Sequence, residues 1–234
     1  IIDLNKTAVK IDEAAEALKA IAKSGRKILF VSTKKQGQEV VAQKAQEVAM
    51  PYITERWAGG MLTNFPTIRK AVKKMGQIDK MMSDGTLENV SKREKLQITR
   101  QREKLEKNLG SIADLTRLPS AVFVVDVMKE HIAVAEANRL GIPVFGIVDT
   151  NSNPNNIDFV IPANDDATKS IDTILAAVCS AIQEGLEERK VEKADESAAE
   201  AQTNAEAPAP KERRQRIRKA APKAEEPKAE EAAE

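Results

Sequence analysis

The chain is 234 residues long, and its 37 basic and 36 acidic side chains leave a formal net charge of +1. No apolar stretch approaches the roughly 20 residues that a membrane-spanning helix needs, which argues against a membrane protein. The one cysteine, Cys179, excludes a disulfide within the chain and suits a reducing compartment, where we expect it to pack as a small apolar side chain.

The charge is distributed unevenly along the chain. Residues 56–107 carry thirteen basic and six acidic side chains, whereas residues 121–184 carry three and nine. One strongly basic stretch in a near-neutral protein is typical of a globular body with an electrostatic contact surface, although a solvated face is the simpler alternative. From residue 187 onward large apolar side chains are almost absent, so we expect residues 187–234 to be a disordered, charged tail.

The first 186 residues alternate between short apolar runs and amphipathic stretches. Residues 1–4 look extended, and apolar residues then recur at helical spacing up to Gly25. Further helices are predicted over about 35–48, 130–140 and 165–186. Predicted strands are residues 27–32, 50–54, 121–125, 143–148 and 158–161. This alternation predicts an α/β fold, a Rossmann-like (flavodoxin-like) doubly wound sheet of about five parallel strands.

The connection between the second and third strands is about 65 residues long, whereas a crossover with its helix usually needs only about a dozen. The excess predicts two helices, over 64–82 and 91–109. Ser91 and Glu94 have capping-box spacing at the start of the second helix, and Gly110 is a typical helix-ending residue. We therefore predict an α/β body of residues 1–61 and 111–186. An antiparallel helical hairpin, a coiled-coil arm, is inserted at residues 62–110.

The only tryptophan, the only adjacent glycine pair and a basic run lie together between Arg56 and Lys74. Trp57 is expected to anchor a loop whose glycines offer backbone amides to phosphate oxygens. The basic side chains can neutralise successive phosphates. The residues predicted to contact nucleic acid are Arg56, Trp57, Gly59, Gly60, Thr63, Asn64, Arg69, Lys70, Lys73 and Lys74, with Lys34 and Lys35 after the first strand. Further candidates in the tail are Arg213, Arg214, Arg216 and Arg218, for which incidental charge in a disordered stretch is the alternative.

An enzymatic alternative rests on the ends of the predicted strands. Asp126 and Asp149 end neighbouring strands near Lys34, and such a set could hold Mg²⁺ and a phosphoryl group. No strand is followed by a glycine-rich phosphate loop, and the one histidine, His131, lies near a helix start. Because Asp and Asn commonly form turns and caps, a structural role is favoured, and no cofactor or metal is expected.

The run Arg56-Trp57-Ala58-Gly59-Gly60-Met61-Leu62-Thr63-Asn64-Phe65 closely resembles the signature of the bacterial small-subunit ribosomal protein S2 family. Other segments resemble that family in the same order, namely residues 2–7, 27–34, 103–110, 141–151 and 159–167. The resemblance covers about residues 1–186. The family's N-terminal segment is absent before Ile1, and the long tail lies outside the family core.

This resemblance implies a non-enzymatic constituent of the small (30S) ribosomal subunit, active in translation on the cytoplasmic ribosome. It implies binding to 16S rRNA where head and body meet, and help in docking ribosomal protein S1. The expected partners are 16S rRNA and other small-subunit proteins, with no membrane, no small-molecule substrate and no homo-oligomer. Whether the helical arm meets RNA or protein is left open.

Overall fold

The computed structural model describes residues 2–85 and 91–205, with the helical backbone alone described for residues 195–205. The chain divides into two compact units, Ile1–Asp195 and Glu196–Glu234. The sheet, the helical hairpin and the helices that cover the sheet, the last of them as far as Asp195, belong to the first unit. Among the described helices, none is long and apolar enough to cross a membrane.

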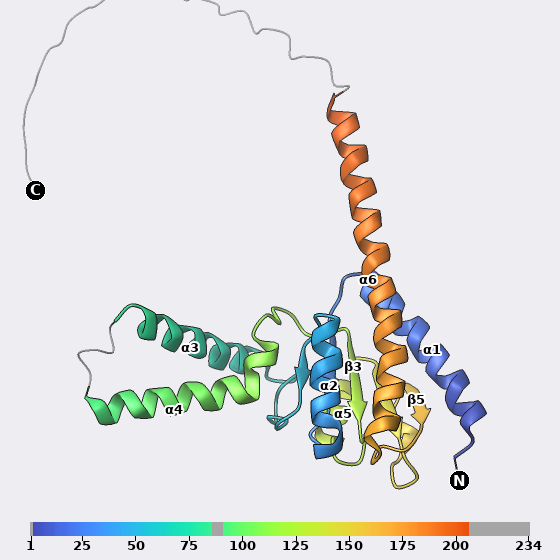
Figure 1. Cartoon of the computed structure of the whole chain (residues 1–234), viewed down its shortest axis with the longest axis horizontal. Helices are drawn as coiled ribbons and strands as arrows, with labels where there is room; N and C mark the ends of the chain where they lie inside the picture. The colour runs from blue at the N-terminus through green and yellow to red at the C-terminus, as the bar shows by residue number, and fades with distance from the viewer. Residues whose placement is uncertain (1, 86–90, 206–234) are drawn as a thin grey trace, which may run out of the picture. The chain divides into compact units, whose positions relative to one another are not determined.

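A five-stranded parallel sheet forms the centre of the first unit (Figure 1). Its strand order is β2-β1-β3-β4-β5. Its strands are β1 (Ile28–Val31), β2 (Tyr52–Ile53), β3 (Ala121–Val125), β4 (Val144–Val148) and β5 (Phe159–Pro162). The register brings aromatic residues into line across the sheet, with Phe30 paired to Phe123, Phe123 to Phe145 and Phe145 to Phe159. This strand order is that of flavodoxin-like folds, so the predicted doubly wound α/β sheet is confirmed.

Helices bury both faces of the sheet. Figure 1 shows α1 (Leu4–Lys23), α2 (Lys35–Glu47) and α6 (Thr168–Ala205) on one face and α5 (His131–Arg139) on the other. Successive strand residues point to opposite faces of the sheet. Phe123 therefore packs under α1, α2 and α6, and Val122 and Val124 pack under α5. Cys179 on α6 is buried in the first core, and burial raises the pKa of its thiol to about 12.

The two ends of the first unit differ from the sequence prediction. Residues 1–4 were predicted to be extended, but α1 already begins at Leu4, and Asp3 Oδ1 accepts a hydrogen bond from Asn5 N at 3.0 Å. At the other end α6 continues to Ala205, so residues 187–205 are helical, whereas disorder was predicted from residue 187. Alanine and glutamate are good helix formers, which the tail prediction underweighted. Residues 206–234 and the four tail arginines lie outside the described residues.

The long connection contains the two predicted helices, α3 (Phe65–Ser83) and α4 (Lys92–Leu109), which lie side by side (Figure 1). Ser91 Oγ accepts a hydrogen bond from Glu94 N at 3.3 Å, which confirms the predicted cap. Gly110 does not end α4 in a left-handed turn, because its φ is −58° and the chain continues into the short 3-10 helix η2 (Gly110–Ile112). A second 3-10 helix, η3 (Pro154–Asn156), precedes β5.

Candidate nucleic-acid interface

The loop that joins β2 to the hairpin is held by a single carboxylate, that of Glu136 on α5. Its Oε1 accepts hydrogen bonds from Trp57 Nε1 at 3.1 Å and Gly60 N at 2.7 Å. Its Oε2 accepts from Leu62 N at 2.9 Å, Thr63 N at 3.1 Å and Thr63 Oγ1 at 3.2 Å. Trp57 and Glu136 are each only 8% exposed. The loop is therefore fixed to the body from its inner side.

These bonds change the role predicted for the loop amides. The amides of Gly60 and Thr63 donate to Glu136, so they do not face a phosphate. Gly60 has φ +85°, a left-handed conformation that favours glycine, and a Cβ there would lie 3.2 Å from Asn64 Cβ. A Cβ on Gly59 would meet nothing within 4 Å, so of the two adjacent glycines only Gly59 has open space beside its backbone. Gly59 is also exposed, so its backbone is the one of the two that a partner molecule can approach.

Glu136 is charged in this position. Burial alone would raise the pKa of its carboxyl, but hydrogen bonds from the backbone of Thr63, Gly60 and Leu62 and from Trp57 outweigh it and hold the pKa below its ordinary value. Hydrogen bonds to a carboxylate are stronger than those between neutral groups. A buried anion thus organises the segment that leads into a basic hairpin.

The base of the hairpin is attached to the body at two further points. Arg69 Nη1 on α3 donates to Leu115 O at 2.7 Å, and this side chain is half-buried. Ser111 Oγ, just after α4, donates to the backbone carbonyl of Tyr52 on β2. Arg69, predicted as a phosphate contact, therefore has its guanidinium turned to the body.

Three lysines on the outer face of α3 are exposed, and these are Lys70, Lys73 and Lys74. Arg56, in the loop before the hairpin, is also exposed. Among the described residues, none of these four side chains has a hydrogen-bond or ion-pair partner. Asn64 is exposed too, and its Oδ1 accepts from Thr67 Oγ1 at 2.8 Å. Part of the predicted RNA-binding set is thus exposed to solvent, on α3 and on the loop that precedes it.

Lys34 has a different role from the one predicted. Its Nζ lies 2.8 Å from Asp165, 2.5 Å from Asp166 and 3.3 Å from Asp126, and its side chain is 13% exposed. Burial alone would lower the pKa of the ammonium. The hydrogen bonds to Asp165 and Asp166 and the charge of Asp126 raise the pKa by more than burial lowers it, so the net shift is upward. The ammonium is therefore committed to an internal ion-pair cluster. Lys35, at the first residue of α2, is exposed.

The strand-end carboxylates behave as turn formers and as partners of Lys34. Asp126 Oδ1 accepts from Lys129 N at 3.0 Å, and Asp149 Oδ1 from Thr150 N at 2.6 Å. Carboxylate oxygens of Asp149, Asp165 and Asp166 lie within 4.8 Å of one another, and the Lys34 ammonium supplies positive charge to two of these groups. The geometry favours the structural role over the catalytic alternative.

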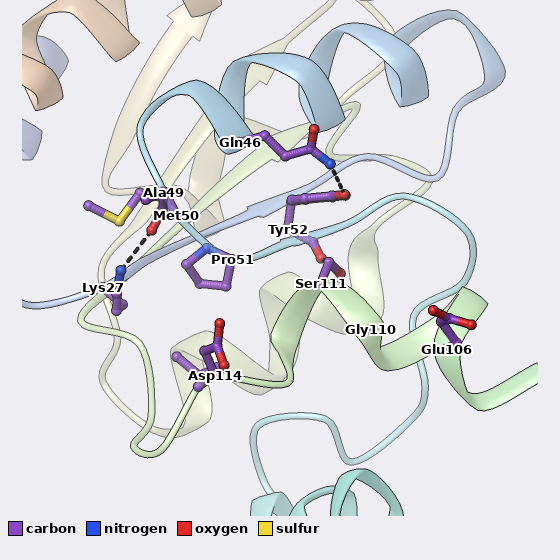
Figure 2. Close-up of a pocket in the computed structure, with 11 residues that line it drawn as sticks. Lys27, Gln46, Ala49, Met50, Pro51, Tyr52, Glu106, Gly110, Ser111 and Asp114 are labelled. Atoms are coloured by element: carbon purple, nitrogen blue, oxygen red, sulfur yellow. Dashed lines mark hydrogen bonds between the residues drawn. The ribbon is translucent and has the colours of Figure 1, made fainter. Parts of the chain in front are cut away.

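A hollow of about 630 Å³ lies beside β2, where the end of the hairpin meets the body (Figure 2). Three of its polar side chains, those of Lys27, Gln46 and Ser111, bond to neighbours that also line it. Lys27 Nζ donates to Ala49 O at 2.7 Å, and Gln46 Nε2 to Tyr52 Oη at 2.5 Å (Figure 2). This hollow reflects how the insertion packs against the edge strand, and its polar groups do not converge on a ligand position.

Glu136 is the main residue that the sequence prediction missed. It lies on α5 beside the buried Ala133, Val134 and Ala137. The sequence therefore contained one indication of its role, a single acidic residue among the apolar residues on the buried face of a helix. Such a residue needs buried partners. Nothing nearby in the sequence identified them, because the donors lie 73 to 79 residues earlier in the chain.

Comparison with known proteins places these features in a family. The chain matches the family described as ribosomal protein S2 over residues 1–185. It is 75% identical over 199 residues to small ribosomal subunit protein uS2 of Parabacteroides distasonis, covering 85% of this chain and 72% of that protein. The corresponding protein of Bacteroides thetaiotaomicron is 71% identical over 218 residues, covering 93% and 77%. That of Porphyromonas gingivalis is 72% identical over 193 residues, covering 82% and 69%. The matched region contains the sheet, the Glu136-bound loop and the helical hairpin, and the chain belongs to the ribosomal protein S2 family.

Proposed function

We propose that this chain works in translation as a structural constituent of the small ribosomal subunit, in the cytoplasm, and that it binds 16S rRNA through its helical hairpin. Proteins of the S2 family are ribosomal proteins and not enzymes. The alternative of a phosphoryl-processing enzyme at Asp126 and Asp149 is therefore set aside.

The observation that carries RNA binding is the exposed lysine face of α3. This helix has five basic side chains against one acidic one, and Lys70, Lys73 and Lys74 have no partner among the described residues. Lysines on one face of a helix can each neutralise a phosphate and release its counterions. Such contacts give affinity that tolerates sequence differences and weakens with salt. Folded ribosomal RNA is a partner with this chemistry.

The proposed contact surface extends from α3 onto the adjoining loop. Arg56, Gly59 and Asn64 are exposed there, and Lys35 is exposed on the body. Trp57, Gly60, Thr63 and Arg69 serve the surface indirectly, because their described bonds fix the loop and the hairpin base to the body. This division separates contact residues from those that hold them in place.

Two finer assignments follow the family resemblance. We place the binding site between the head and body of the subunit, with other small-subunit proteins as neighbours. We further propose that the protein helps to dock ribosomal protein S1. The amount of S1 on small subunits that carry variants of this chain tests the docking role separately from RNA binding.

The test of RNA binding is the full-length variant Lys70→Glu with Lys73→Glu. In cells where it is the only copy, less of the variant should sediment with small subunits on a sucrose gradient. With purified protein and 16S rRNA, the slope of log affinity against log salt should fall by about two, one for each lost phosphate contact.

The matched control is Arg139→Glu with Lys169→Glu, which makes the same charge change at two exposed positions on α5 and α6. It should sediment and bind as the unaltered protein does. If the α3 variant keeps normal occupancy and an unchanged salt slope while it remains folded, the proposed RNA surface is wrong.

A further inference from the structure

We propose that the hairpin carries a second RNA-contact surface on the outer face of α4 and so bridges two separate segments of ribosomal RNA. This inference rests on the proposed RNA-binding function and extends it. Three basic residues define the surface, Arg93, Arg100 and Lys104, together with Gln97 between them. They are called the α4 stripe below.

The spacing of the α4 stripe places it on one helix face. Its members follow one another at intervals of four, three and four residues, which are neighbouring positions on an α-helix. All four side chains are exposed. Within the described part of the chain, the side chains of Arg93, Arg100 and Lys104 have no hydrogen-bond or ion-pair partner.

Two other basic residues of α4 pair with acidic side chains of the hairpin or its loop, while Lys92 and Lys95 are exposed near the start of the helix. Arg102 Nε lies 2.5 Å from Asp79 Oδ1 on α3. Lys107 Nζ lies 3.1 Å from Glu55 Oε2 in the loop before the hairpin. The hairpin thus satisfies the basic side chains that face the other helix or the body and leaves the α4 stripe free.

The α4 stripe and the α3 lysines lie on opposite outer faces of the hairpin. The two helices contact each other, Arg102 of α4 pairs with Asp79 of α3, and half-buried Val72 and Leu105 pack against the same core. Lys70 and Lys73 lie on the far side of α3 from this contact, and Arg100 and Lys104 on the far side of α4. With helices of about 10–12 Å diameter packed about 8–10 Å apart, the outer faces are separated by roughly 20 Å. One straight RNA segment cannot contact both faces, so two segments are required.

Charge favours a polyanion over a protein as the partner of the α4 stripe. α4 has seven basic side chains against three acidic ones, and it packs beside α3, which is also basic. Like charges on adjacent helices repel, and phosphates on each outer face relieve that repulsion. Protein interfaces are centred on aromatic or apolar anchors. Leu96, 50% exposed, is the one large exposed apolar side chain that the described residues of α4 offer.

The experiment compares three full-length double variants with the same charge change. Arg100→Glu with Lys104→Glu tests the α4 stripe, Lys70→Glu with Lys73→Glu tests α3, and Arg139→Glu with Lys169→Glu is the control. Hydroxyl-radical footprinting of 16S rRNA in small subunits reconstituted with each protein identifies which nucleotides each face protects. The neutral variant Arg100→Gln with Lys104→Gln keeps good helix formers and covers the case in which the Glu variant fails to fold.

We expect the α3 and α4 variants to lose protection at two different rRNA segments, and the control to lose none. The salt slope of 16S rRNA binding should fall by about two for each variant and by about four when they are combined. If the folded α4 variants keep every protection while the α3 variant loses some, the second surface is wrong and the proposed function stands. If the α4 variants lose a neighbouring ribosomal protein and no RNA protection, the partner is a protein and the inference is overturned. If neither face affects RNA, the proposed function fails with it.

Discussion

At the scale of single residues, Glu136 has more bonding partners than any other described carboxylate outside the Lys34 cluster. Five donors from Trp57, Gly60, Leu62 and Thr63 converge on its two oxygens. A buried carboxylate is costly unless such donors surround it. Removal of its charge would therefore leave both a weaker acceptor and several unsatisfied backbone amides.

We predict that Glu136→Gln lowers the free energy of unfolding by about 2–4 kcal/mol. The glutamine amide keeps one acceptor oxygen, but its NH₂ group would face the N–H groups that the second carboxylate oxygen now accepts from. Urea unfolding measures the change. Trp57 is the only tryptophan, so its fluorescence reports the loop directly. Glu103→Gln, the same change at an exposed position on α4, should stay within about 0.5 kcal/mol. Equal effects at both positions would contradict the role given to Glu136.

The pH dependence of this effect has a definite sign. The pKa of Glu136 is lowered from the ordinary 4.5, so the unfolded chain takes up the proton more readily than the folded protein. Its stabilising contribution is complete well above pH 4.5 and is lost as the pH falls through the lower, folded-state pKa. The difference in unfolding free energy between the unaltered protein and Glu136→Gln should therefore shrink between pH 6 and pH 3. A difference that stays constant over this range would show that the charge of Glu136 contributes nothing.

At the scale of helices and strands, close packing of α6 on α1 is what fixes the first unit at its carboxyl end. A Cβ added to Gly185 on α6 would lie 2.5 Å from the backbone carbonyl oxygen of Lys19 and 3.3 Å from Ala22 Cβ. The two helices approach at a position where only hydrogen fits. Ion pairs from Lys19 and Lys23 to Glu184, Glu188 and Glu192 continue this contact along the helix surfaces.

We predict opposite effects for the same substitution in two helices. Gly185→Ala should destabilise the protein by about 1–3 kcal/mol, because the helices must move apart. Gly76→Ala on α3 meets nothing within 4 Å and should stabilise it by about 0.5–1 kcal/mol through helix propensity alone. Thermal unfolding of the two variants checks the pair, and a stabilising Gly185→Ala would contradict the close contact.

Most elements could be predicted from the sequence because burial leaves a strong pattern. β3, buried at all five positions, reads as a continuous apolar run, and the length of the β2–β3 connection required an insertion. The helical part of the predicted tail was missed because its stability comes partly from ion pairs with α1, which no local pattern contains. For the interface, residue type identified the exposed lysines of α3. Residue type could not distinguish these exposed lysines from Lys34 and Arg69, because the groups that bind Lys34 and Arg69 lie elsewhere in the chain.

At the scale of the whole molecule, positive charge is concentrated in the inserted hairpin and negative charge in the second half of the body. Residues 121–184 carry nine acidic side chains against three basic ones. A polyanion is therefore attracted to one part of the protein and repelled by another, which orients the encounter before contact. This asymmetry makes the proposed RNA binding compatible with a nearly neutral net charge.

Two truncations would establish where the body ends. A chain that stops after residue 205 should melt at the same temperature as the full chain, because the compact first unit ends at Asp195. A chain that stops after residue 186 should melt at a lower temperature, because it loses Glu188 and Glu192, which pair with Lys19 and Lys23. Calorimetry distinguishes the two, and equal melting temperatures would mean that residues 187–205 add nothing to the body.

The Glu136 contact also imposes an order on synthesis. The loop donors are made 73 to 79 residues before the carboxylate that they bind. At about 5–20 residues per second, these loop donors leave the ribosome roughly 4–15 seconds ahead of Glu136. During that interval Trp57 and the loop amides lack their acceptor. A nascent chain of this protein thus contains the loop before it contains the carboxylate that fixes the loop to the body.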